Sequence, residues 1–228
     1  MEIGTNDWSN FLINQAKIID IQLDHTQNHL FAIHAMELIK WNHKINITTI
    51  TDPVEVASSH FLDSLVPARF IPSDATMLDI GSGGGFPGIP LKVFLPKLSV
   101  TLIDASRKKT SFLKHVIRSL KLEHIEALHM RAEDLAIQPS FINRFDVVIS
   151  RALSSLDAFV RLALPLLTNG GVIIALKGEV EKAELDNLRD NVLKKMNSGG
   201  STDRQFTISR ERYSLPTLNA ERSVITVR

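Results

Sequence analysis

The sequence predicts a doubly wound, Rossmann-like α/β fold with a mostly parallel, seven-stranded sheet and an N-terminal helical extension. Two observations lead to this prediction. Short apolar segments alternate with amphipathic ones from residue 76 to about residue 195, as strands and crossover helices of a parallel sheet do. A glycine-rich run at residues 81–88 directly follows the first of these apolar segments. Such a run is typical of the turn from the first strand into the first helix of this fold.

The elements follow from the same pattern. We expect strands at residues 76–80, 100–104, 125–130, 145–150 and 171–176, with helices at 107–120, 156–167 and 179–195. After a turn at 197–202, two β-rich segments at 205–212 and 222–228 predict a terminal hairpin added to the sheet.

The residues before this pattern are expected to be helical. Apolar residues recur at helical spacing over the first 45 positions. Asp52, Pro53 and Glu55 then read as an N-cap, a first-turn proline and a capping-box acid, and the helix that they start carries His60 and Asp63. We therefore predict a helical extension over residues 1–72 that packs on a core domain at 73–228.

Bulk composition excludes several classes of protein. No apolar run reaches the length of a membrane span, and the first 30 residues lack a basic start followed by an apolar stretch, so a cytoplasmic protein is expected. The absence of cysteine excludes disulfides, thiolate metal sites and the cysteine adduct by which pyrimidine C5 is usually methylated. Of His25, His29 and His34, only the first two have i,i+4 spacing and no carboxylates complete a site, so no metal is expected.

The net charge of +1 conceals an uneven distribution. Residues 1–78 carry four Lys or Arg and nine Asp or Glu, whereas residues 104–131 carry seven basic and three acidic side chains. A polyanionic partner and a merely solvated helix face explain this basic segment equally well.

The position of the glycines distinguishes between two cofactors. The first strand leads directly into Gly81, so the turn belongs to Gly81, Gly83 and Gly85, and Asp79 ends the strand close to the ligand. A carboxylate there would repel a pyrophosphate but suits S-adenosylmethionine, which carries an ammonium and a sulfonium. Asp104, after the second strand, can accept from ribose hydroxyls in either case. S-adenosylmethionine is favoured, and a dinucleotide or an empty turn are the alternatives.

Further candidates follow the other strands, because ligands of this fold lie beyond the carboxyl ends of the strands. Glu133 could accept from an adenine amino group or could cap the next turn. Arg151 follows the fourth strand, where no Asn/Asp-Pro-Pro-aromatic run of amino methyltransferases occurs. It could pair with the cofactor's carboxylate, a phosphate or a guanine edge, or form a structural salt bridge. Lys177 could hold an RNA phosphate or be solvated.

The chain resembles the bacterial glucose-inhibited division protein B family of 16S ribosomal RNA guanine-N7 methyltransferases over about residues 40–180. The continuation after the glycines is the most specific part of the resemblance. The matching runs are Trp41-Asn42, Asn46-Ile47-Thr48, Ile50, Glu55, His60-Phe61-Leu62-Asp63-Ser64-Leu65, Asp79-Ile80-Gly81-Ser82-Gly83, Gly85-Phe86-Pro87-Gly88-Ile89-Pro90, Asp104-Ala105-Ser106, Lys108, Lys109, Phe112-Leu113, Ile149-Ser150-Arg151-Ala152 and Leu176-Lys177-Gly178.

The resemblance implies a class I S-adenosylmethionine-dependent methyltransferase that releases S-adenosylhomocysteine. Its target would be one guanine near the decoding centre, position 527 of 16S rRNA, in the free RNA or the small subunit, with the enzyme expected as a monomer. The family's cofactor contacts fall on Gly81, Phe86, Ala132, Glu133 and Arg151. Gly84 departs from the family, which often has Ala or Pro there, and this is expected to change loop stiffness only.

RNA is expected on the basic segment after the second strand and at Lys177, through Arg107, Lys108, Lys109, Lys114 and Lys177. Guanine N7 has an in-plane lone pair and no proton to lose, so no catalytic residue is assigned: alignment of donor and acceptor suffices, with Arg151 at the acceptor cleft. Carboxylates or carbonyls near the ring would favour the transfer. His60 and Asp63 could shape the substrate side of the cleft or form a structural pair.

Three other functions remain as alternatives: a methyltransferase for another acceptor, a non-catalytic nucleotide- or RNA-binding module, and a dinucleotide oxidoreductase.

Overall fold

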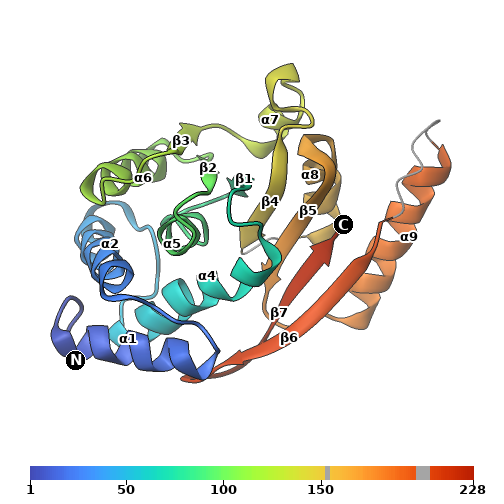
Figure 1. Ribbon diagram of the computed structural model, residues 1–228. Coiled ribbons are helices and arrows are strands. Elements are labelled where there is room, and N and C mark those ends of the chain that lie inside the picture. The colour runs from blue at the N-terminus through green and yellow to red at the C-terminus, as the bar shows by residue number, and fades with distance from the viewer. Residues whose placement is uncertain (152–154, 199–205) are drawn as a thin grey trace.

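A seven-stranded sheet forms the centre of the protein (Figure 1). The computed structural model describes residues 1–151, 155–198 and 206–228. Its strands have the order β3-β2-β1-β4-β5-β7-β6. Their bounds are β1 Thr76–Ile80, β2 Ser99–Asp104, β3 Ile125–His129, β4 Phe145–Arg151, β5 Leu167–Lys177, β6 Ile208–Leu215 and β7 Leu218–Val227. Strands β1 to β5 pair in parallel, whereas β7 is antiparallel to both β5 and β6. The predicted fold class and the terminal hairpin are therefore confirmed.

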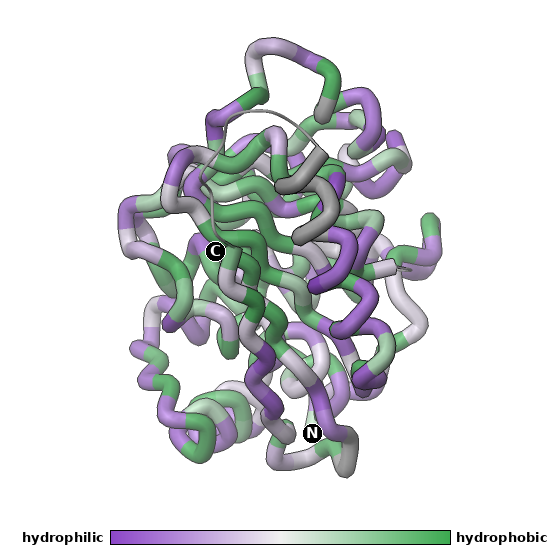
Figure 2. Tube along the Cα trace, turned by 90° about the vertical axis from the view of Figure 1, so that its right-hand side faces the viewer, coloured by the Kyte–Doolittle hydropathy of each residue, from purple (hydrophilic) through white to green (hydrophobic). Residues whose placement is uncertain are grey.

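Helices cover both faces of this sheet. One face carries α5 (Gly88–Phe94) and α6 (Arg107–Ser119), and the other carries α7 (Ala132–Ala136), α8 (Leu156–Ala163) and α9 (Lys182–Ser198) (Figure 1). Alternate strand residues divide between the two cores: Met77 and Val147 face the α5 side, while Leu78 and Val148 face the α8 side. Figure 2 shows hydrophobic strands inside and more hydrophilic segments around them.

The N-terminal segment is helical, as predicted, and continues the core on the α5 side. Its elements are α1 (Asn6–Ile18), α2 (His25–Ile45), α3 (Pro53–Glu55), the π-helix η1 (Val56–Leu62), α4 (Asp63–Leu65) and the 3₁₀ helix η2 (Val66–Phe70). Trp8 and Phe61 are fully buried in the same cluster as Met77 of β1. The division at residues 72 and 73 stays a prediction.

The structure differs from the sequence prediction at two places. The Asp52 cap is confirmed, since its carboxylate accepts from the Val54 and Glu55 amides, but the helix after it widens into the π-helix η1. The helix predicted at 156–167 is α-helical as α8 up to Ala163. Its last turn is the 3₁₀ helix η4 (Leu164–Leu166), which contains Pro165, and β5 begins at Leu167.

Some predictions concern residues outside this description. Residues 199–202 of the predicted turn, residue 205 of the β-rich segment and Ala152 of the matched run lie outside the described residues. In the part of the chain that the structure describes, no helix is long and apolar enough to cross a membrane.

Candidate functional site

The glycine loop joins β1 to α5 at the carboxyl edge of the sheet. Gly81, Gly83 and Gly85 have φ values of +74°, +55° and +91°, a region that side chains with a Cβ rarely adopt. The amides of Gly81 and Ser82 both donate to the Ile103 carbonyl of the neighbouring strand β2. The turn therefore begins directly at the end of β1, as expected if the glycine run binds S-adenosylmethionine.

Asp79 lies behind this loop rather than in the open cleft. Its side chain is fully buried, and Oδ2 accepts a 2.9 Å hydrogen bond from the Gly88 amide at the start of α5. Its Oδ1 is buried with no hydrogen-bond partner among the described residues. Burial raises the pKa of Asp79 to about 7. The sequence placed this carboxylate beside the ligand; the structure makes it a support for the loop, because α5 starts directly over it.

A cavity of about 400 Å³ opens on the other side of the loop. It lies at the ends of β1, β2 and β3 and is lined by Ile80, Gly81, Ile103, Asp104, Ala105, Met130, Arg131, Ala132 and Glu133. Asp104 is oriented there by two amides: Gly83 donates to Oδ2 at 3.0 Å and Ser106 to Oδ1 at 2.7 Å. Each oxygen retains a second lone pair for a ribose hydroxyl. This cavity brings together the predicted contacts Gly81, Asp104, Ala132 and Glu133.

These features fit a bound S-adenosylmethionine. The cavity offers a carboxylate for ribose hydroxyls, an exposed carboxylate at Glu133 and apolar walls at Ile80, Ile103 and Met130 for a nucleoside. Asp79, with its Oδ1 unpaired and its pKa raised to about 7, is partly ionised at neutral pH; a cationic ligand beside the loop would favour the charged carboxylate, and a pyrophosphate would not.

Phe86 is enclosed by two histidines. It is 3% exposed, and the rings of His34 and His60 lie nearly parallel to it at centroid distances of 4.7 and 4.5 Å. Burial lowers the pKa of His34 to about 4, and burial together with the Arg151 charge lowers that of His60 to about 3. Both imidazoles are therefore neutral at pH 7. Phe86 is thus buried between the two imidazoles and lines neither of the cavities described here, and its predicted cofactor contact stays a prediction.

A second cavity of about 350 Å³ lies at the ends of β4 and β5. Its lining residues are Ile50, Ser59, His60, Arg151, Leu176, Lys177, Gly178 and Arg222. Three of them are cationic, and His60, which is neutral, is the only other ionisable group among the described residues that line it. Carboxylates or carbonyls were expected around the acceptor, but the charged side chains that line this cavity are basic. We refer to it as the acceptor cavity.

Arg151 is held in this cavity by the helical segment before β1. Its Nη1 donates to the Ser59 carbonyl at 2.5 Å, its Nη2 donates to His60 Nδ1 at 3.3 Å, and Nη1 lies 3.6 Å from Asp63 Oδ2. Since Arg151 can only donate, His60 Nδ1 accepts and its Nε2 carries the proton toward Thr48 Oγ1, 3.0 Å away. Burial lowers the pKa of Arg151, with the Asp63 charge opposing that shift.

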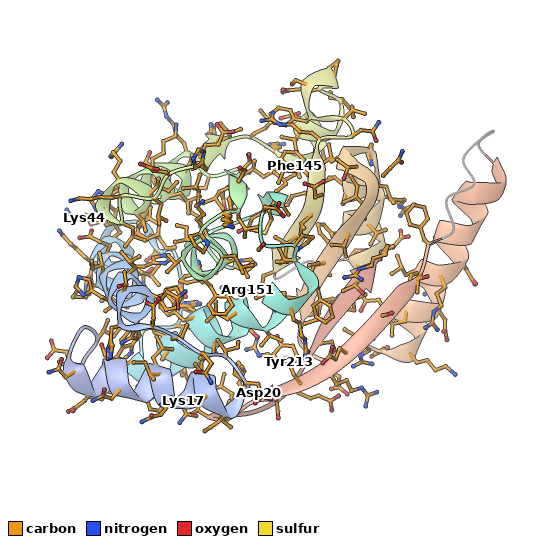
Figure 3. All side chains as sticks on the ribbon, in the orientation of Figure 1. Lys17, Asp20, Lys44, Phe145, Arg151 and Tyr213 are labelled. Carbon is orange, nitrogen blue, oxygen red and sulfur yellow. The ribbon has the colours of Figure 1, made fainter. Side chains whose placement is uncertain are left out.

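Asp63 connects elements that are distant in the sequence. Its side chain is 1% exposed, and it accepts hydrogen bonds from the Tyr213 hydroxyl at 2.6 Å and from Arg222 Nη1 at 3.1 Å. Figure 3 shows Arg151 and Tyr213 near the α4 segment that carries Asp63. Arg151 lines the cavity and forms a salt bridge with Asp63, and its contact with the cofactor, a phosphate or a guanine stays a prediction. His60 lines the cavity, but among the described residues it forms no hydrogen bond or ion pair with Asp63. Tyr213 and Arg222 were missed because no motif marks them.

Lys177 is neither free nor solvated. Its side chain is 14% exposed, and Nζ lies 2.5 Å from Glu184 Oε1 on α9. The solvated alternative is therefore wrong, and the predicted phosphate contact stays a prediction that must compete with this ion pair.

The basic residues of α6 are more accessible. Arg107, Lys108 and Lys114 are exposed and Lys109 is half-buried, and none of the four forms an ion pair within the described residues. The helix begins at Arg107, two residues after Ala105, which lines the cavity at the ends of β1, β2 and β3. We refer to that cavity as the nucleoside cavity. Over the same described residues, no group of three His, Asp or Glu side chains is arranged to hold a metal ion.

Known proteins match both the sequence and the fold. The family model for rRNA small subunit methyltransferase G matches residues 27–206. A protein of that name from Desulfitobacterium hafniense is 42% identical over 167 residues, covering 73% of this chain and 70% of the relative. The one from Geobacter sulfurreducens is 45% identical over 161 residues, covering 70% and 73%.

Among solved structures, a SAM-dependent methyltransferase from Aquifex aeolicus aligns with a TM-score of 0.55 at 15% identity, covering 85% of this chain and 97% of that one. This likeness shows the fold. Together with the family match, it confirms the predicted dependence on S-adenosylmethionine. With four fifths of its length matched by the family model, this chain belongs to the rRNA small subunit methyltransferase G family.

Proposed function

We propose that this protein transfers a methyl group from S-adenosylmethionine to N7 of a single guanine, position 527 of 16S rRNA. The substrate class rests on the family, whose members are named for the small subunit rRNA. The choice of N7 rests on one observation: none of the described side chains that line the acceptor cavity is suited to act as a general base.

The ionisable groups that line the acceptor cavity are three cations and one weakly basic histidine. Arg151, Lys177 and Arg222 are cations, and His60, with a pKa of about 3, is a weak base whose Nδ1 lone pair is already taken by Arg151. An acceptor hydroxyl or amine has to lose a proton on methylation, for which a nearby base is needed. Guanine N7 has no proton to lose, so a cavity of this composition suits it.

The protein's contribution is then positioning. When bound, S-adenosylmethionine supplies an electrophilic methyl group on a positively charged sulfur. Asp104 and Glu133 orient the nucleoside from the cavity at the ends of β1 to β3, while the walls of the acceptor cavity orient the base at the ends of β4 and β5. Alignment of this kind reduces the entropic part of the barrier. The positive charge moves from the sulfur to the guanine ring, so the cations that line the acceptor cavity do not assist the transfer, and the proposed contribution of the protein is positioning.

The experiment is methyl transfer from labelled S-adenosylmethionine to 16S rRNA and to small subunits from cells that lack this enzyme. Nucleoside mass spectrometry then identifies the product. One 7-methylguanosine at one site is the expected result. Label on another atom would reject the N7 assignment, and cofactor binding without label on either substrate would reject the rRNA assignment.

A matched pair of variants tests the cofactor side. Asp104→Asn keeps the size of the side chain and removes its charge, and loss of charge-assisted hydrogen bonds to the ribose is expected to weaken cofactor binding about tenfold or more. Asp74→Asn removes an exposed carboxylate from the loop before β1 and is the control. Equal affinities of the two variants in a calorimetric titration would remove Asp104 from the proposed site.

A further inference from the structure

Arg222 stands in the acceptor cavity without a role in the sequence motifs. It lies on β7 opposite Tyr213 of β6, one residue before Ser223, which pairs with Lys177 of β5. This register brings its side chain, 25% exposed, to the cavity that Arg151 and Lys177 also line. The matched runs end at Gly178, so nothing in them points to this residue.

The charges around the cavity do not cancel. Lys177 is neutralised by Glu184, and His60 is neutral because of its lowered pKa. Arg151 and Arg222 share one carboxylate, Asp63, whose Oδ2 lies 3.6 and 3.1 Å from their nearest nitrogens. Among the described residues, Arg151 and Arg222 thus have a single carboxylate within salt-bridge distance, and the buried Asp79 acts on Arg151 only at longer range.

The hydrogen bonds of Arg222 are also incomplete. Its Nη1 donates to Asp63, and this is its only side-chain hydrogen bond within the described residues. Nε is buried without an acceptor. Asp63 accepts from Tyr213 at Oδ1 and from Arg222 Nη1 at Oδ2, and it forms no second hydrogen bond with Arg222 among the described residues. An arginine has five N–H donors, and two adjacent ones match the two oxygens of a phosphate.

We propose that Arg222, together with Arg151, binds a phosphodiester of the RNA strand next to the target nucleotide. This assignment rests on the proposed function, and it names the backbone contact that holds the strand while the base enters the cavity. Asp63 acts as the clamp that fixes both guanidinium groups, with Tyr213 fixing Asp63 in turn. A phosphate in the cavity supplies negative charge beside the two guanidinium groups and acceptors for the Nη nitrogens of Arg222, which are not buried as Nε is.

The other anion at hand is the carboxylate of the cofactor, and sheet geometry makes it the weaker candidate for Arg222. In the order β1-β4-β5-β7, the strand that carries Arg222 is three positions from the strand that opens the glycine loop. With about 4.8 Å between neighbouring strands, their backbones are about 14 Å apart. Arg151, on β4 next to β1, is the better placed of the two for the cofactor.

The test measures binding of the target RNA and of the cofactor separately. We expect Arg222→Gln to weaken binding of unmodified 16S rRNA about tenfold and to leave the dissociation constant for S-adenosylmethionine unchanged. The slope of log affinity against log salt concentration should become less steep by about 0.7–0.9, which is the contribution of one phosphate contact. Arg212→Gln is the matched control, since Arg212 is exposed on β6 and pairs with Glu221.

Other outcomes overturn the proposal. Weaker cofactor binding with an unchanged RNA salt slope would assign Arg222 to the cofactor's carboxylate. If both affinities match those of Arg212→Gln, Arg222 is only structural.

If Arg222→Gln does not fold, Arg222→Lys is compared with the wild type on RNA whose phosphates beside the target guanine are replaced one at a time by uncharged methylphosphonates. The proposal requires one phosphate whose replacement weakens RNA binding by the wild type about tenfold and weakens RNA binding by Arg222→Lys by a smaller factor. If every replacement weakens binding by the two proteins to the same extent, the proposal is refuted.

The wild-type protein separates this proposal from the proposed function. If the wild type methylates no guanine of 16S rRNA, the function itself is wrong. If it methylates N7 and Arg222→Gln behaves as Arg212→Gln does, only the phosphate contact is wrong.

Discussion

Asp79 makes the stability of the cofactor-free protein depend on pH in an unusual direction. The buried carboxyl has a pKa of about 7 in the native protein and an ordinary value of 3.8. Between these values the native state binds the proton more tightly than the unfolded chain does. The stability contributed by the protonated carboxyl is complete below pH 3.8 and is lost as the pH rises through 7.

The size of the effect follows from these two pKa values. From pH 5 to pH 8 the free energy of unfolding should fall by about 2–3 kcal/mol through this one group. In Asp79→Asn the group cannot ionise, while the side-chain oxygen can still accept from the Gly88 amide. From pH 5 to pH 8, the free energy of unfolding of Asp79→Asn should therefore rise relative to that of the wild type by the same amount.

The assay is urea denaturation of both proteins at pH 5, 6, 7 and 8 without cofactor, with Asp74→Asn as a control at an exposed position. Other titrating groups are common to the proteins and cancel in the difference. Parallel stability curves for Asp79→Asn and the wild type across this range would refute the claim that burial governs this carboxyl.

Four further outcomes are expected. Gly88→Ala should destabilise the protein by about 1–3 kcal/mol or more, measured by denaturation, because its Cβ would lie 2.3 Å from Leu102 Cδ2 and 2.7 Å from Asp79 Oδ2; a variant as stable as the wild type contradicts this packing. Tyr213→Phe should cost about 1–3 kcal/mol of stability by leaving Asp63 Oδ1 without its donor, and unchanged unfolding would show that the bond contributes nothing. A combined Arg107→Gln, Lys108→Gln and Lys114→Gln variant should raise KM for RNA and flatten its salt dependence, whereas Lys17→Gln with Lys97→Gln, both at exposed positions outside α6, should not. The kcat at saturating cofactor and RNA should be level from pH 6 to 8; a limb that persists in Asp79→Asn would signal an essential acid or base and count against positioning.

The part of the site that depends on local backbone geometry was predictable from the sequence. Gly81, Gly83 and Gly85 adopt conformations that favour glycine, and Asp104 follows a strand in a fold whose ligands bind at strand ends. Both features are fixed by residues close together in the chain, so a motif is enough to place them.

The acceptor cavity was less predictable because long-range pairing forms it. Asp63, Arg151 and Arg222 come from a helical segment and two strands that meet only in the folded sheet. The π-helix η1, which carries His60, also has no marker in the sequence pattern. Likewise the pairing of Lys177 with Glu184 depends on how α9 returns along the sheet, which no spacing within either segment reveals.

The dependence on Asp63 has a consequence for how the enzyme matures during synthesis. The nucleoside cavity is lined entirely by residues 80–133, all of which precede β6 and β7 in the chain. The acceptor cavity needs Arg222, and the clamp at Asp63 also needs Tyr213, both from the later hairpin of β6 and β7. During synthesis, the residues of the proposed cofactor site are therefore all made before the proposed RNA site can be completed, so RNA binding at this site has to wait for the hairpin.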